Sequence, residues 1–222
     1  MTKASAARPQ KSSFHDAESV LRESDPRLGR LIDAVVERAG RQRFPPSPAA
    51  THFEALARSI VYQQLSGKAA ATIWGRVVGV LGGAVTPEPI LSAADETLRA
   101  AGLSNSKVRY VRALARAVHD GEVDLDHVES LPDDAVIRTL TAVSGIGVWT
   151  AQMFLMFRLH RPDVLATGDL GIQKGLQIAH CLKNPAAPGY VLRAGSRWAP
   201  HRSLACLYLW AALDLKVSLT ED

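Results

Sequence analysis

Cysteine is scarce in this chain. Only Cys181 and Cys206 are present among 222 residues. Two thiols argue against a disulfide framework and cannot supply the four thiolates that commonly hold an iron–sulfur cluster, so we expect no such cluster. Long apolar runs are also missing: the longest spans residues 204–213, whereas a membrane-spanning helix needs about 20 apolar residues. No secretory signal is recognisable, so we expect no membrane partner and a cytoplasmic, bacterial-type location associated with the nucleoid.

The chain also lacks the alternation of apolar and polar residues that marks half-buried strands. Helical spacing is frequent instead. Asp25 and Pro26 form a typical helix start, and Leu28, Ile32 and Val35 then follow on one face. The fold is therefore predicted to be all-α. The seven histidines form no recognisable metal-binding triad.

Acidic residues are slightly outnumbered by basic ones. The chain has 26 Lys and Arg against 22 Asp and Glu, which gives a net charge of +4. This balance favours an acidic partner such as nucleic acid, although many basic proteins bind none. The first 13 residues contain Lys3, Arg8 and Lys11, with no acid and little that could pack. They are predicted to form a disordered basic tail.

Gly145-Ile146-Gly147 lies between two helical patterns and predicts a tight turn. A glycine can take a positive φ, and a second bare backbone position would let amides approach an anion closely. The start of the next helix adds unpaired N–H groups and the positive end of its dipole. Gly145, Gly147 and Thr150 are therefore expected to bind a DNA phosphate. The alternative is an ordinary turn with Ile146 packed in the core.

Residues 140–151 and the downstream Asp169-Leu170-Gly171-Ile172 together resemble the helix-hairpin-helix superfamily of DNA base-excision glycosylases. Within that superfamily, the chain is similar to the 3-methyladenine DNA glycosylase II family. Segments 59–66, 103–107 and 199–203 also agree in order, so the likeness covers roughly residues 50–213.

The resemblance implies two helical lobes with a cleft between them. The N- and C-terminal parts of the chain would form one lobe, and the middle of the chain the other. The expected parts are a basic tail at 1–13, a terminal lobe of 14–50 plus 165–222, and a central lobe at 51–164 with the helix-hairpin-helix motif at 133–159.

The resemblance also names Asp169 as the catalytic carboxylate. Cleavage of an N-glycosidic bond develops positive charge on the sugar, and a fixed carboxylate can stabilise that state while it orients or deprotonates water. Asp169 also stands where an aspartate caps the helix that starts at Leu170. The two roles are compatible, because a helix N-terminus stabilises negative charge.

Other functional positions follow from the same resemblance. Gln64 occupies the place of the wedge residue that fills the duplex after base flipping, although a solvated loop amide is the alternative. Met153 stands where an aromatic residue is frequent, which leaves the base preference open. Core packing is the alternative for every aromatic residue and is preferred for Trp74, Phe154 and Trp198. The expected sets are Tyr62, Trp149, Met153 and Trp210 for the base pocket, and Gln64 with Leu65 for the wedge.

Trp149 stands where relatives that also nick the strand carry a lysine for a Schiff base. The resemblance therefore implies a monofunctional glycosylase that excises alkylated bases of the 3-methyladenine and 7-methylguanine type from duplex DNA. It needs no cofactor, although main-chain carbonyls of Thr141, Val143 and Ile146 could hold a monovalent cation. We expect a monomer without an obligate protein partner.

Two alternatives stay open. One is a non-catalytic DNA-binding or damage-sensing protein built on the same hairpin, against which the presence of Asp169 argues. The other is a related glycosylase for oxidised or mismatched bases, which the missing hairpin lysine and cysteine cluster disfavour.

Overall fold

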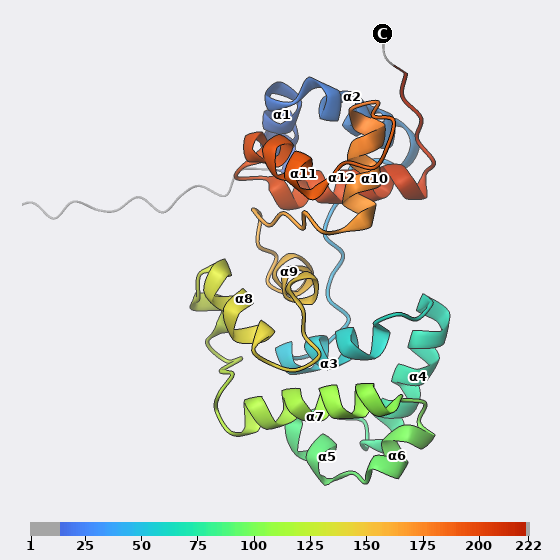
Figure 1. Ribbon diagram of the computed structural model, residues 1–222, viewed down its shortest axis with the longest axis vertical. Coiled ribbons are helices and arrows are strands. Elements are labelled where there is room, and N and C mark those ends of the chain that lie inside the picture. The colour runs from blue at the N-terminus through green and yellow to red at the C-terminus, as the bar shows by residue number, and fades with distance from the viewer. Residues whose placement is uncertain (1–13, 221–222) are drawn as a thin grey trace, which may run out of the picture. The chain divides into compact units, whose positions relative to one another are not determined.

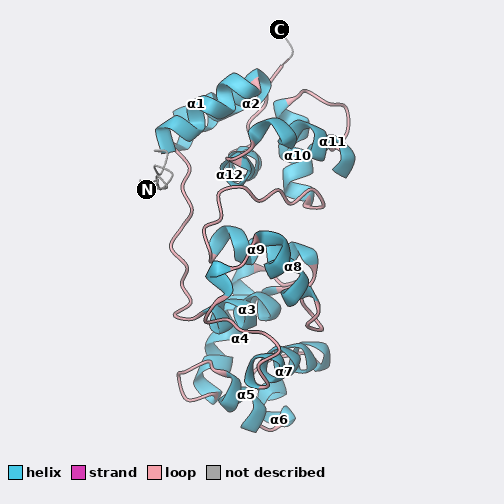
Figure 2. Cartoon of the chain, turned by 90° about the vertical axis from the view of Figure 1, so that its left-hand side faces the viewer, coloured by secondary structure: helices cyan, strands magenta, loops and turns pink. Residues whose placement is uncertain are grey.

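The computed structural model describes residues 14–220, and within that range the chain is helical without any strand (Figures 1 and 2). This confirms the predicted all-α class. The basic tail expected at 1–13 lies outside the described residues. Among the helices of residues 14–220, none has the length and apolar character needed to cross a membrane.

The chain divides into two compact units. The terminal unit combines the residues up to Arg43 with those from Pro162 onward, and the central unit comprises Phe44–Arg161. The helices of the terminal unit are α1 (Phe14–Ser24), α2 (Pro26–Ala39), α10 (Leu170–Ala179), α11 (Pro188–Gly195) and α12 (Arg202–Asp214). Those of the central unit are α3 (His52–Tyr62), α4 (Gly67–Val80), α5 (Pro87–Ser92), α6 (Asp95–Ala100), α7 (Asn105–His119), α8 (Asp133–Thr141) and α9 (Val148–Phe157).

The boundaries differ from those expected at 50/51 and 164/165, and side-chain contacts explain the difference. The Arg158 guanidinium at the end of α9 donates to the carbonyl oxygens of Ala49 and Ala50 at 2.8 and 3.2 Å. This fixes the proline-rich segment before α3 to the central unit. Asp163 instead pairs with Arg202 of α12 at 2.6 Å. The chain between α9 and α10 therefore belongs to the terminal unit from Pro162 onward.

In the terminal unit, α10 and α12 pack closely against each other (Figure 1). Gly175 permits this approach, because a Cβ atom at that position would lie only 2.5 Å from the Leu209 carbonyl oxygen.

Trp198 is fully buried, and Phe154 of the central unit is nearly so, which confirms both as core residues. Trp74 is only half-buried.

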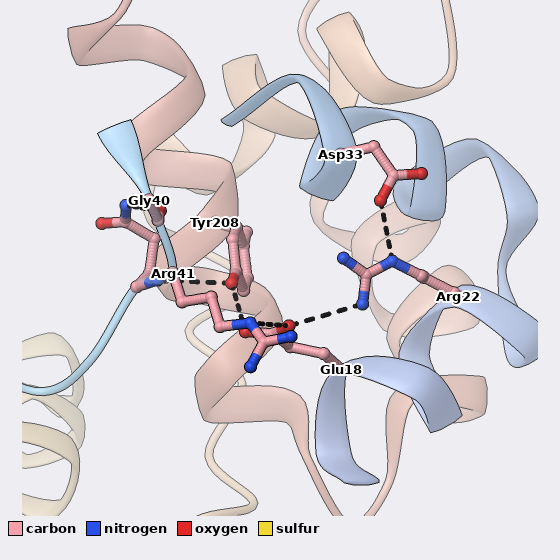
Figure 3. Close-up of polar contacts among 7 residues, drawn as sticks. Glu18, Arg22, Asp33, Gly40, Arg41 and Tyr208 are labelled. Carbon is pink, nitrogen blue, oxygen red and sulfur yellow. Dashed lines mark hydrogen bonds and ion pairs between the residues drawn. The ribbon is translucent and has the colours of Figure 1, made fainter. Parts of the chain in front are cut away.

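A buried carboxylate joins three segments of the terminal unit (Figure 3). Glu18 of α1 accepts a hydrogen bond from the Tyr208 hydroxyl of α12 at 2.6 Å and pairs with Arg22 at 3.4 Å and Arg41 at 3.3 Å. The Tyr208 oxygen also accepts from the Gln42 amide at 3.3 Å. Burial and the bond to Glu18 raise the pKa of Tyr208. The chain leaving α2 is thus held against α12.

Asp25 organises a second buried cluster in the same unit. Its carboxylate caps α2 by accepting from the Leu28 amide at 3.2 Å, and it also accepts from His180 Nε2 at 3.1 Å and Trp198 Nε1 at 3.0 Å. Burial alone would raise the pKa of Asp25, but these hydrogen bonds outweigh it and hold the pKa below its usual 3.8. The start of α2 is thereby tied to the rest of the unit.

Candidate active site

The hairpin of the central unit is formed by α8, a turn and α9. Gly145 in the turn has φ +94°, and a Cβ atom there would lie 2.3 Å from Cγ of Tyr110 on α7. Both the backbone conformation and the close approach therefore require glycine. Ile146 is buried, so the turn is anchored in the core as the alternative interpretation expected. The anchoring and an exposed anion-binding edge are compatible.

Gly147 is the N-cap of α9 and behaves differently from Gly145. Its φ is −92°, and a Cβ atom there would meet nothing within 4 Å. Val148 and Trp149, which follow it, are 54% and 50% exposed. The N-terminus of α9 is therefore open to solvent within the central unit, as the predicted phosphate contact requires.

Thr150 does not offer its side chain to that contact. The side chain is buried, and its Oγ1 lies 3.4 Å from Gln63 Nε2, which donates to it. Only the backbone amide of Thr150, in the first turn of α9, suits an external phosphate. The sequence pattern alone does not distinguish these two possibilities.

The predicted wedge lies on a loop between α3 and α4, as expected. Gln64 has φ +58° and is exposed, and Leu65 is 38% exposed. Ser66 then caps α4 by accepting from the Ala69 amide at 3.5 Å. A positive φ is uncommon for a residue with a side chain, so this conformation depends on the contacts around it.

Wedge and pocket candidates of the central unit surround one open hollow of about 610 Å³. This volume falls within the usual range for small-ligand sites. The hollow brings together the predicted pocket residues Tyr62, Trp149 and Met153. Its lining also includes Ser59, Gln63, Gln64, Leu65, Gly147 and Thr150.

Arg58 of α3 contacts the pocket candidate Tyr62 and was not among the predicted site residues. Its guanidinium carbon lies 3.9 Å from the centroid of the Tyr62 ring, and its Nη2 donates to the Tyr62 hydroxyl at 2.7 Å. One face of Tyr62 is therefore already occupied by a cation, which leaves only the opposite face for a base. The i,i+4 spacing of the two residues on α3 was the available signal.

Asp169 and Trp210 lie in the terminal unit and contact each other. Asp169 caps α10, and its Oδ1 accepts from the Ile172 amide and from Trp210 Nε1, both at 2.8 Å. Both the cap and the orientation of the carboxylate are thus fixed. A Cβ atom at Gly171 would lie 2.7 Å from Trp210 Cδ1 and 3.0 Å from Asp169 Oδ1. Glycine at this position leaves the room in which the indole reaches the carboxylate.

The carbonyls suggested for a monovalent cation lie at the end of α8 and in the turn. Helix C-termini leave carbonyls without intrahelical partners, which suits this purpose. The Val143 oxygen already accepts from the Ile146 amide at 3.1 Å, so a cation would use its second lone pair. Across residues 14–220, no group of three or more His, Cys, Asp or Glu side chains is arranged to hold a metal ion.

Comparison with known proteins agrees with these features. Residues 57–201 match the family described as HhH-GPD superfamily base excision DNA repair protein. DNA-3-methyladenine glycosylase 1 of Schizosaccharomyces pombe is 36% identical over 208 residues, which cover 92% of this chain and 90% of that protein.

Solved structures give the same result. A DNA-3-methyladenine glycosidase from Bacillus halodurans superposes with a TM-score of 0.78 at 40% identity, covering 88% of each chain. The S. pombe 3-methyladenine DNA glycosylase in complex with abasic DNA gives a TM-score of 0.77 at 32% identity, covering 89% of this chain and 96% of that one. The chain belongs to the HhH-GPD superfamily of base excision DNA repair proteins.

Proposed function

We propose that the protein is a monofunctional DNA glycosylase that excises alkylated bases of the 3-methyladenine and 7-methylguanine type from duplex DNA. The names of the relatives support the alkylated substrate. The observation that carries the chemistry is the doubly held carboxylate of Asp169, which accepts from the Ile172 amide and from Trp210 Nε1. An aspartate fixed in this way is preorganised for charge that develops beside it.

In the proposed reaction, the bond between C1′ of the sugar and the base nitrogen breaks, and its electron pair leaves with the base. A base alkylated at N3 or N7 of the purine starts with a positive charge and departs neutral, so it needs no general acid. The carboxylate of Asp169 stabilises the cationic sugar and accepts a proton from the attacking water. The products are the free base and an abasic site.

Position 149 holds a tryptophan and not a lysine, so no amine is available there for a Schiff base. This supports hydrolysis without strand cleavage. The hairpin amides would hold the duplex backbone without reading its sequence. Gln64 would fill the gap left by the flipped base, which is most easily extruded where pairing is already weakened.

A monomer acting on chromosomal DNA in a nucleoid-associated cytoplasm would suffice for this function. We propose no obligate protein partner and no required cofactor. A monovalent cation on the carbonyls of Thr141, Val143 and Ile146 would neutralise part of a nearby phosphate charge and strengthen the grip of the hairpin. Its addition should change DNA affinity rather than the chemical step.

The test is single-turnover release of free base from methylated duplex DNA by the wild-type protein and by Asp169→Asn, with strand nicking followed in parallel. Release by the wild-type protein alone, without nicking, is expected. Binding by both proteins without release from any lesion in a broad panel would favour a non-catalytic damage sensor. Nicking coupled to release would overturn the monofunctional assignment.

A further inference from the structure

Lys107, near the start of α7, holds the loop that joins α3 to α4 and carries Gln64 and Leu65, here called the wedge loop (residues 63–66). Its ammonium donates to the carbonyl oxygens of Val61 at 2.6 Å and Gln63 at 2.8 Å. These carbonyls lie at the C-terminal end of α3 and just beyond it, where helix carbonyls lack intrahelical partners. A lysine that binds two of them fixes the direction in which the chain leaves α3.

The same loop is fastened to the hairpin by Gln63. Its side-chain Nε2 donates to the Gly145 carbonyl oxygen at 3.0 Å and to Thr150 Oγ1 at 3.4 Å. Gly145 lies in the hairpin turn, and Thr150 lies in the first turn of α9. One amide group therefore links the residue before Gln64 to both parts of the predicted phosphate-binding structure.

Helix α7 contacts both ends of this link, the wedge loop through Lys107 and the hairpin turn through Tyr110. Tyr110 is three residues after Lys107 and so lies on the same side of α7. Its ring occupies the space in which a Cβ atom of Gly145 would stand. In the central unit, α7 lies between α3 on one side and α5 with α6 on the other (Figures 1 and 2). One helix face thus sets the position of the wedge loop relative to the hairpin.

We propose that Lys107 and Gln63 are positioning residues that hold Gln64 in register with the hairpin, so that the wedge is aligned whenever the hairpin grips the backbone. The proposal rests on the assignment of Gln64 as wedge within the proposed function. Gln64 has φ +58°, and such a conformation persists only where its surroundings determine it. Holding the loop in advance lowers the ordering cost of insertion.

The test compares binding to an intact duplex with binding to the same duplex containing a tetrahydrofuran abasic-site analogue, which presents a ready gap. The wild-type protein should prefer the gapped duplex. Lys107→Met should lower that preference by about tenfold. The cost of ordering one side chain on binding corresponds to a change of this size. Its affinity for the intact duplex should change only as much as in Lys183→Met, which removes the same charge from an exposed loop of the terminal unit. Lys107→Arg should restore most of the preference.

Gln63→Leu provides a second variant, because it cuts the link to the hairpin while Lys107 keeps its carbonyl partners. Circular dichroism melting verifies that each variant is folded. An unchanged gap preference in both variants overturns the proposal, as does an equal loss of affinity for both duplexes. Base release is measured separately on the wild-type protein. Its absence would overturn the proposed glycosylase function, while the binding ratio still tests the positioning role.

Discussion

The indole Nε1 of Trp210 donates a hydrogen bond to Oδ1 of Asp169 at 2.8 Å. The bond joins the last long helix of the chain to the N-cap of α10, and Gly171 leaves the space that it needs. A residue expected to stack on a base is therefore also a donor to the expected catalytic carboxylate. Substitutions that remove the N–H donor but keep an aromatic ring can distinguish these two roles.

Gly171→Ala tests whether the contact matters. The added methyl group would start 2.7 Å from Trp210 Cδ1, so the indole must move away from the carboxylate. We expect a loss of base release of about 100-fold and a cost of about 1–3 kcal/mol in the free energy of unfolding. Gly168→Ala is the matched control, because a Cβ atom there meets nothing within 4 Å. Equal activities of the two variants would contradict the positioning of Asp169 by Trp210.

Asp169→Asn tests the carboxylate itself. Asparagine caps helices about as well as aspartate, and its amide oxygen can still accept from the Ile172 amide. We expect base release to fall by at least about 100-fold, while DNA binding stays the same or improves because a negative charge is removed. Thermal unfolding should be little changed. Asp214→Asn, at the exposed end of α12, removes the same charge and should release base normally.

Trp210→Phe keeps an aromatic face but removes the N–H donor, and Trp210→Ala removes both. If the indole also stacks on the base, Trp210→Ala should impair release of cationic 7-methylguanine more than release of neutral hypoxanthine, by about 2- to 30-fold. Trp210→Phe should slow both bases to a similar degree. The measurement is single-turnover release from paired substrates. Equal losses for both bases in Trp210→Ala would show that Trp210 serves only as a donor.

The sequence predicted much of this arrangement because its strongest signals are local. Helical periodicity and caps gave the fold class, and the glycine turn gave the positive φ at Gly145. Contacts between distant segments carry no such pattern. Three such contacts depend on tertiary structure. Tyr110 packs against Gly145, the side chain of Thr150 is buried, and Arg158 hydrogen-bonds to the segment before α3.

The site was predictable to a similar extent. Family likeness named Asp169, but only the structure reveals the Trp210 donor and the need for Gly171. The resemblance also gave Tyr62 as a base contact without indicating that Arg58 covers one of its faces. A cation stacked on an aromatic ring at i,i+4 spacing looks like an ordinary surface pair in the sequence.

Acid should weaken the terminal unit through Asp25. Its folded pKa lies below the usual 3.8, so its stabilising effect is complete at pH above 3.8 and is lost as the pH falls through the folded value. Thermal unfolding between pH 7 and 2.5 measures this loss. Asp25→Asn should cost about 1–3 kcal/mol at pH 7 and flatten the acid dependence. Glu37→Gln, on the exposed side of α2, should retain it. An acid dependence in Asp25→Asn as steep as that of the wild-type protein would assign the effect to other groups.

The two hairpin glycines should respond differently to alanine. Gly145→Ala combines a φ of +94° with a Cβ atom 2.3 Å from Tyr110 Cγ, so we expect a cost of about 3 kcal/mol or more. Adding Tyr110→Ala should relieve only the steric part. Gly147→Ala should leave stability within about 0.5 kcal/mol, because its Cβ atom meets open space.

Gly147→Ala should nevertheless weaken DNA binding, since a methyl group at the start of α9 keeps a phosphate away from the amides. The loss in affinity should be equal for intact and alkylated duplexes, because backbone contacts position the duplex without reading bases. Unfolding curves and dissociation constants for both duplexes decide the matter. A Gly147→Ala protein with altered preference between lesions would show that the hairpin contacts bases, and the phosphate-binding role of this turn would then have to be abandoned.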